Sequence, residues 1–270
     1  MDKEINYITS RYYKHEDNEL AGNWIKEKFQ SFGLETTVSN IYKDFNGFHS
    51  GKGKNIIAVK PGLLNPKKMY LICAHYDSVP QKGDAPGADD NASGVAAVLE
   101  AARVFSKMKI DNTIIFAALD EEEPEEGLYG SKFFIYDFNS SKKPGDTLVG
   151  VINMDMIAYD GNNDNLIDIH THSIADSEEL ANRIVEINKL NNIGCKVGVL
   201  NPGSDHVDSQ AFWDNNISAV TMLEDTDEAD FNPNYHTSED HISALNKSYF
   251  EKTAKLVIAS IASLVLPYSM

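Results

Sequence analysis

The stretch Thr113-Ile-Ile-Phe-Ala-Ala-Leu119 is apolar throughout and is followed at once by Asp120-Glu-Glu-Glu123. An unbroken apolar run of this length is typical of a β-strand that is covered on both faces, as in a parallel sheet. Two further runs have the same character, MYLICA at 69–74 and LVGVINM at 148–154. These three runs predict the centre of a sheet, with acidic residues placed where one of its strands ends.

Helical periodicity fills the segments around these strands. We expect helices at 18–32, 93–109, 130–138, 177–192, 209–215 and 247–266, and strands at 35–38, 55–59, 69–75, 113–119, 148–154, 166–170 and 217–223. In the first helix, Leu20, Trp24, Phe29 and Phe32 lie near one predicted face. The alternation predicts one α/β domain over residues 1–270, with a mostly parallel central mixed β-sheet flanked by helices on both faces.

Composition narrows the range of functions. The 270 residues include 24 Lys+Arg against 41 Asp+Glu, a formal net charge of −17. Nucleic acids and anionic membranes select basic surfaces, so we expect neither as a partner. The longest apolar stretch, 256–267, is shorter than the roughly 20 residues that a membrane span needs. We expect a monomer.

Two features leave the cellular compartment open. The amino terminus has no apolar signal segment, so the chain as given is cytoplasmic unless an export signal has been removed, in which case it is periplasmic or secreted. Cys73 lies in a buried run and Cys195 in a predicted loop, and no Cys-x-x-Cys motif occurs.

Residues that bind metals or transfer protons follow the predicted strands. They are His75, Asp77, Asp89, Asp90, Glu122, Glu123 and Asp155, with His236 nearer the end of the chain. In open α/β sheets, ligands bind outside the carboxyl ends of the strands. Zinc is bound by imidazole nitrogen and carboxylate oxygen, and a catalytic zinc site leaves a position open for water. The pattern therefore indicates hydrolysis at a metal centre.

Each of these residues alone has a simpler explanation. Asp89 and Asp90 are suited to capping the helix that follows, Asp155 to capping a turn, and residues 121–126 to forming a solvated acidic loop. A single histidine is more often structural than a metal ligand. What favours the metal centre is that all of these segments end buried strands or begin the adjacent loops.

The ordered motifs resemble the co-catalytic di-zinc aminopeptidases of the bacterial leucyl aminopeptidase type, a superfamily shared with glutaminyl cyclases and transferrin-receptor-like ectodomains. The motifs are His75-Tyr-Asp-Ser78, Pro86-Gly-Ala-Asp-Asp-Asn-Ala-Ser-Gly94, Glu122-Glu123, Asn153-Met-Asp-Met156, Ser204-Asp-His206 and Tyr235-His-Thr-Ser-Glu-Asp240. The resemblance runs from Ser10 to the last helix, nearly the whole chain.

The resemblance implies a ligand set for two zinc ions. Asp90 would bridge both ions. One ion would also be held by His75 and Asp155, and the other by Glu123 and His236. The choice of Asp90 over Asp89 comes from the family pattern, in which the ligand directly precedes Asn-Ala-Ser-Gly.

The resemblance also implies roles for residues that do not bind metal. Glu122 would be the general base, because adjacent side chains on an extended segment point in opposite directions and the two glutamates need not share one role. Asp77 would hold His75, and Asp205 and His206 would shape the site. An apolar substrate pocket is expected from Met156, Met222, Phe231 and Tyr235.

The sequence departs from the family pattern in two places. Pro124-Glu-Glu126 lengthens the loop before Gly127-Leu-Tyr-Gly-Ser131, so counting from the strand gives the pair Glu122-Glu123, whereas counting back from Gly127 gives Pro124-Glu125. The strand register is preferred because loops absorb insertions. A cysteine pair that some relatives carry near the substrate pocket is absent.

The predicted activity is release of the amino-terminal residue, preferably apolar, from peptides with a free amino terminus. A glutaminyl cyclase is the first alternative, although cyclases tend to carry Trp where Tyr235 precedes His236. A non-enzymatic receptor or scaffold is the second, and loss of ligands would be its mark. A carboxypeptidase or dipeptidase is less favoured because no dimerisation domain is visible.

Overall fold

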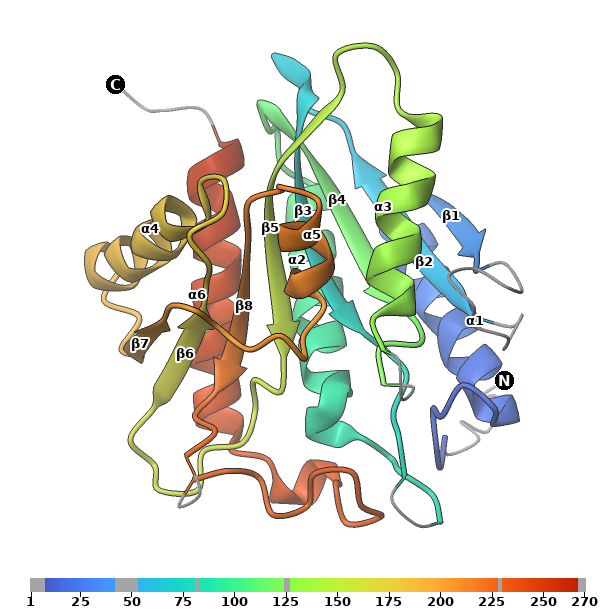
Figure 1. The fold of residues 1–270 in the computed structure, drawn as a ribbon, viewed down its shortest axis with the longest axis vertical. Helices are drawn as coiled ribbons and strands as arrows, with labels where there is room; N and C mark the ends of the chain where they lie inside the picture. Colours follow the sequence, from blue (N-terminus) through green and yellow to red (C-terminus); the bar gives the residue numbers. More distant parts are fainter. Residues whose placement is uncertain (1–7, 42–52, 81–82, 124–126, 228–229, 267–270) are drawn as a thin grey trace.

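All eight described strands form one sheet in the computed structural model, which describes residues 8–41, 53–80, 83–123, 127–227 and 230–266 (Figure 1). The strands are β1 (Glu35–Asn40), β2 (Lys54–Lys60), β3 (Asn65–His75), β4 (Asn112–Leu119), β5 (Thr147–Asp155), β6 (Leu166–His170), β7 (Lys196–Leu200) and β8 (Ala219–Glu224). Their order is β1-β2-β4-β3-β5-β8-β6-β7. The central strands β4, β3, β5 and β8 are parallel, while β1, β2 and β6 introduce antiparallel pairings.

Helices cover both faces of this sheet (Figure 1). On one face, α1 (Glu16–Ser31), α2 (Gly94–Ser106), α4 (Ser177–Leu190) and α6 (Lys247–Val265) enclose the larger hydrophobic core. On the other face, α3 (Tyr129–Ser141) and α5 (Ser209–Asp214) enclose a smaller core. Two short helical segments, η2 (Ala88–Ser93) and η3 (Ile242–Ala244), precede α2 and α6 in the chain. The predicted α/β class, with a mostly parallel mixed sheet between helical layers, is confirmed.

The parallel registers bring the ends of four strands together. His75 is paired with Leu119, and Asp155 with Leu223, so β3, β4, β5 and β8 end at one edge of the sheet. Acidic and imidazole side chains that follow these strands are therefore delivered to the same place.

The sequence left two details of the secondary structure undetermined. In α1, Phe29 of the predicted face is buried, but Leu20 and Trp24 are 48% and 50% exposed, and Ala21 and Ile25 are buried beside Phe29. The segment carries two apolar stripes one residue apart, and only contact with the sheet selects between them. The strand β7 was not predicted, because this half-exposed edge strand has Gly198 at its centre and no continuous apolar run.

Other findings bear on the predicted environment. Cys73 and Cys195 are both free and buried. Over the described ranges, no helix combines the length and the apolar character that crossing a membrane demands.

Candidate metal centre

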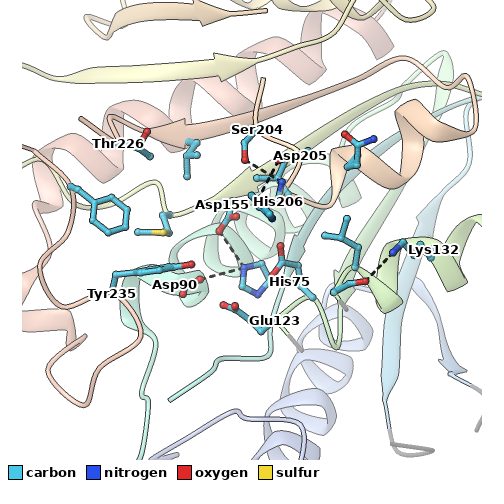
Figure 2. A pocket seen from close by; sticks show the side chains of 18 of the residues that line it. His75, Asp90, Glu123, Lys132, Asp155, Ser204, Asp205, His206, Thr226 and Tyr235 are labelled. Carbon is cyan, nitrogen blue, oxygen red and sulfur yellow. Dashed lines mark hydrogen bonds and ion pairs between the residues drawn. The ribbon is translucent and has the colours of Figure 1, made fainter. Parts of the chain in front are cut away.

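The five predicted metal ligands converge at the carboxyl edge of the sheet, and Figure 2 shows four of them, His75, Asp90, Glu123 and Asp155. Their donor atoms fall into two overlapping groups, His75–Asp90–Asp155 and Asp90–Glu123–His236, and within each group all donor atoms lie within 4.8 Å of one another. Three of the five follow strands directly: His75 ends β3, Asp155 ends β5, and Glu123 comes shortly after β4. The strand ends thus predicted the position of the site.

Asp90 is the member common to both groups. Its Oδ1 lies 3.4 Å from Nε2 of His75, and its Oδ2 lies 3.1 Å from Nε2 of His236. The carboxylate therefore presents one oxygen to each half of the site. This is the arrangement that a carboxylate bridging two cations requires.

Each imidazole also meets a second carboxylate through the same nitrogen. Nε2 of His75 is 3.2 Å from Oδ1 of Asp155, and Nε2 of His236 is 3.1 Å from Oε2 of Glu123. On its other side, the Nδ1 atom of His75 faces the carbonyl oxygen of Asp77 at 3.2 Å. A hydrogen bond from Nδ1 to a carbonyl leaves Nε2 as the nitrogen that can bind a metal.

The electrostatics of the site call for cations. Burial raises the pKa of Glu122 well above its ordinary value, and the carboxylates of Glu123 and Asp155 raise it further against the opposing effect of His75. Burial alone would lower the pKa of His75, but Glu122 and Asp155 raise it well above its ordinary value. Buried carboxylates thus outnumber the imidazoles that face them. Divalent zinc, which takes this mixture of nitrogen and oxygen donors, fits the site.

Asp77 organises the centre from behind. Its Oδ1 accepts a hydrogen bond from the backbone N–H of Glu122, and its Oδ2 accepts one from that of Glu123, each at 3.2 Å. Nδ1 of His75 also lies 3.5 Å from Oδ1 of Asp77. The buried Asp77 carboxylate therefore positions His75 at the end of β3 and also Glu122 and Glu123 after β4. The sequence predicted only the contact with His75.

The three consecutive glutamates after β4 have different environments. Glu122 lines the cavity above the metal ligands, whereas the Glu121 carboxylate lies directly against Gly53. The backbone of Glu121 has a φ of 58°, in the left-handed region that non-glycine residues seldom adopt. That turn separates Glu121 from the next two glutamates. Glu122 and Glu123 do not point in opposite directions as expected, because their carboxylates form a group with His75 in which all donor atoms lie within 4.8 Å of one another. The lengthened loop, residues 124–126, lies outside the described residues.

Asp89 and Asp90 are likewise separated by their partners. Asp89 accepts hydrogen bonds from Ala158 N at 2.9 Å and from Asn232 Nδ2 at 3.0 Å, so it ties η2 to the loop after β5. It belongs to neither group of candidate ligands. The geometry therefore agrees with the assignment of Asp90, and Asp89 has a structural task.

Two residues whose roles were not predicted hold η2 in place. The Asp240 carboxylate accepts hydrogen bonds from the backbone N–H groups of Asp89 and Asp90, at 3.0–3.1 Å. The buried Arg11 guanidinium donates to the carbonyl oxygens of Tyr76 at 2.6 Å and Gly87 at 2.8 Å. Both contacts join segments remote in sequence, and no local pattern signals them.

Asp205 and His206, which were expected to shape the site without binding metal, lie at the mouth of the cavity. The side chains of Asp205 and His206 are 79% and 92% exposed and lie 3.4 Å apart at the rim of the cavity. Asp208, which was not singled out, is buried, and burial raises its pKa to about 7. It is near enough for its charge to raise the pKa of Glu122 as well. The sequence signal that could have indicated Asp208 is its position two residues after the motif Ser204-Asp-His206.

An apolar wall borders one side of the cavity, which has a volume of ≈ 650 Å³. Met156, Phe231 and Tyr235 line it as predicted. The Tyr235 ring stacks on His236 with ring centroids 3.6 Å apart and meets the Phe231 ring edge-on at 5.1 Å. The prediction for Met222 is wrong: it is fully buried in the larger core. Side chains alternate along β8, so its neighbour Leu223 reaches the cavity instead.

Three residues beside the cavity or the metal ligands have left-handed backbone. Met156 and His236 have φ angles of 48° and 58°, and Leu128 has 63°. Each such residue costs on the order of 1 kcal/mol or more, and such strain tends to persist where surrounding contacts fix a functional geometry.

Comparison with known proteins places the chain in a family. The profile of peptidase family M28 matches residues 55–261, well over half of the chain. The chain belongs to peptidase family M28. The matched segment contains every candidate metal ligand and Glu122.

Curated M28-like relatives carry two kinds of name. A "Probable zinc metalloprotease" of Pyrenophora tritici-repentis is 34% identical over 166 residues, 56% of this chain, and the match spans 37% of the relative's length. "Leucine aminopeptidase 1" of Trichophyton rubrum is 28% identical over 281 residues, covering 98% of this chain and 73% of the relative. The chain thus spans about a third of the length of the first of these relatives.

Solved structures share the fold of this M28 chain. The LapA aminopeptidase of Legionella pneumophila superposes with a TM-score of 0.77 at 26% identity, covering 95% of this chain and 68% of that one. The glutaminyl cyclase of Porphyromonas gingivalis gives a TM-score of 0.77 at 20% identity, covering 95% and 93%. At that identity the second likeness concerns the fold alone.

Proposed function

We propose that this chain is a metallo-aminopeptidase that uses two zinc ions and Glu122 to remove the amino-terminal residue from peptides. The observation that carries the proposal is the placement of Asp90, whose two carboxylate oxygens face His75 and His236 separately. Asp155 and Glu123 complete the two halves of the site. A non-enzymatic scaffold has no need for this complete set of donors.

The proposed hydrolysis divides between the ions and the protein. When bound, a pair of zinc ions supplies a polarised carbonyl and a water molecule of lowered pKa. Glu122 would accept a proton from the attacking water as the oxygen of that water bonds to the carbonyl carbon of the peptide. The same carboxyl group then gives the proton to the leaving nitrogen as the carbon–nitrogen bond breaks. Asp77 keeps Glu122 in position through the backbone bond described above.

The cavity suits a peptide amino terminus. A free α-amine is a cation, and the carboxylates that line the cavity attract it. The side chain of the first residue would contact Met156, Phe231 and Tyr235, where each buried methylene contributes roughly 0.8 kcal/mol. We therefore propose a preference for apolar amino-terminal residues, and that the chain acts as a monomer.

A chromogenic substrate panel tests the proposal. The protein is stripped with a chelator and reloaded with zinc, and hydrolysis of leucyl, methionyl, phenylalanyl, aspartyl and glutamyl p-nitroanilides is followed. The apolar derivatives should be cleaved well ahead of the acidic ones, only after zinc is restored, and amino-terminal acetylation should block cleavage. Cyclisation of glutaminyl peptides with leucyl substrates left intact would instead identify a cyclase.

A further inference from the structure

The cavity continues past the metal centre on the side away from the apolar wall. Figure 2 shows Tyr235 and Lys132 on opposite sides of His75 and Glu123. If the first residue of a peptide contacts the Tyr235 side, the rest of the peptide must extend toward Lys132. The residues on this second side therefore contact the part of the substrate that leaves.

Lys132 is the only lysine or arginine among the described residues that line the cavity. The side chain is half-buried, and its Nζ donates to the carbonyl oxygen of Gly127 at 3.1 Å. Within the described ranges it forms no ion pair. An ammonium has three donors, so Nζ has donors left for a ligand.

The end of the helix that carries Lys132 also favours a negative group. The side chain belongs to the first turn of α3, and Gly127 and Leu128, which directly precede this helix, line the same cavity. This helix end carries partial positive charge, and its first turn contains neither an acidic residue nor a side-chain cap. The nearby Asp214 already accepts a hydrogen bond from Gln210 Nε2 at 2.6 Å.

We propose that Lys132 binds the carboxyl-terminal carboxylate of short peptides, and so makes this chain selective for dipeptides and tripeptides with a free carboxyl terminus. This inference rests on the proposed aminopeptidase activity. In a longer peptide, the terminal carboxylate would lie too far from the scissile bond to reach Lys132. Polypeptide amino termini would therefore be poorer substrates than short fragments.

The test compares free acids with carboxyl-terminal amides. Leu-Gly, Leu-Gly-Gly and Leu-Gly-Gly-Gly-Gly are assayed in both forms with the zinc-loaded wild-type protein and with Lys132→Met. We expect the acid-to-amide ratio of kcat/KM to be about tenfold for at least one of the two shorter peptides, the effect of a hydrogen bond between charged groups. The ratio should be near one for the longest peptide. In Lys132→Met it should fall to near one throughout.

Controls separate this inference from the activity on which it rests. Leucyl p-nitroanilide has no carboxylate, so its cleavage reports the aminopeptidase activity alone. Lys142→Met, at an exposed lysine just after the same helix, should keep the wild-type ratio. Lys132→Arg should retain part of the preference for acids over amides. If the p-nitroanilide is cleaved but wild-type protein treats acids and amides alike, the role of Lys132 is refuted while the activity stands.

A binding measurement covers the case in which Lys132→Met alters catalysis generally. A Leu-Gly analogue with a reduced peptide bond is titrated calorimetrically as acid and as amide. The wild-type protein should bind the acid about tenfold more tightly, and Lys132→Met should bind both forms equally. Equal binding by the wild-type protein would overturn the proposal.

Discussion

Two groups of carboxylates in this molecule look alike when only distances are considered. The strand-end cluster comprises His75, Asp90, Glu123, Asp155 and His236, and the acidic loop cluster comprises Asp160, Asp164 and Asp230. Both clusters contain sets of three donor atoms that lie within 4.8 Å of one another. Their surroundings differ completely.

The fold itself already uses the oxygens of the acidic loop cluster. Asp160 accepts from Asp164 N at 3.1 Å and from Asn246 Nδ2 at 3.2 Å. Asp230 accepts from Asn162 N at 2.8 Å, and Oδ2 of Asp164 pairs with Lys196 Nζ at 2.8 Å. These carboxylates shape a surface loop, as Asp side chains commonly do.

Among the residues that the structure describes, no ammonium, amide or backbone N–H group pairs with the carboxylates of the strand-end cluster. Its carboxylates face imidazole nitrogens that are themselves potential metal ligands, and the cluster lies at the end of a cavity. Convergence of carboxylates is therefore a weak criterion for a metal centre. The informative criteria are imidazoles in the set, a carboxylate shared between two halves, and an adjacent cavity.

The largest expected difference between the clusters is catalytic. Glu122→Gln should lower kcat by about 10²–10⁴-fold, because a positioned general base is typically worth that factor. Folding and zinc content should stay near wild-type. Asp160→Asn, the matched change in the acidic loop cluster, should leave kcat within about twofold. Near-normal turnover in Glu122→Gln would mean that Glu121 or a residue of the following loop supplies the base.

Zinc should stabilise the protein through the strand-end cluster alone. A ligand at a hundredfold excess over its Kd adds about 2.7 kcal/mol to the free energy of unfolding, which corresponds to roughly 5–10 °C in the thermal midpoint. We expect this shift in wild-type protein and in Asp160→Asn, and its loss in Asp90→Asn. Equal shifts in all three proteins, measured by calorimetry with and without chelator, would contradict the assignment of the site.

The position of the strand-end cluster could be predicted because the apolar runs locate the ends of the strands. Parallel strands end at one edge, so His75, Glu123 and Asp155 had to come together once the sheet was recognised. Asp90 lies in η2 and His236 follows no strand directly; both were candidates from the sequence, but only the family resemblance gave them ligand roles and chose Asp90 over Asp89. The sheet order and the antiparallel edge strands were beyond the sequence, since hydrophobic pattern does not specify neighbours.

The sequence could not decide other positions, because several side chains fit the same sequence pattern or because the contacts join distant parts of the chain. Met222 and Leu223 are both apolar, so alternation could not decide which of them faces the cavity. Asp205 and Asp208 are close in sequence, and only tertiary packing exposes one and buries the other. The contacts of Arg11 join residues 65 and 76 positions apart, which no local motif encodes.

Asp168, on the strand next to the acidic loop cluster, gives a smaller effect that depends on pH. Burial, with added repulsion from Asp225 and Asp227, raises its pKa from 3.8 to about 6. The folded protein therefore retains a proton between these pH values that the unfolded chain has lost. The contribution of the protonated Asp168 carboxyl group to folding stability is complete below pH 3.8 and is lost as pH rises through about 6.

Replacement of Asp168 by Asn removes this loss. Asparagine carries no charge at either pH, so Asp168→Asn should be more stable relative to wild-type at pH 7.5 than at pH 4. We expect this gain in the free energy of unfolding to be larger by about 1 kcal/mol at pH 7.5, a modest value because solvent screens part of the repulsion. Urea unfolding at the two pH values measures the difference. Asp84→Asn, at an exposed carboxylate, should show no such dependence. An equal effect of Asp168→Asn at both pH values would contradict the prediction.

The smallest expected effect concerns Lys196, the one cation among the described residues that pairs with the acidic loop cluster. Lys196 and Asp164 are joined at 2.8 Å, but the lysine side chain is 63% exposed. Exposed ion pairs contribute little because solvent and salt screen them. Lys196→Met should therefore change the thermal midpoint by no more than about 2 °C, and the change should shrink further in 1 M salt. The hydrogen bonds from Asn246 and the backbone remain, so they should hold the loop without the lysine. A large loss of stability, undiminished by salt, would mean that the loop carboxylates depend on a cation, and the contrast drawn between the two clusters would fail.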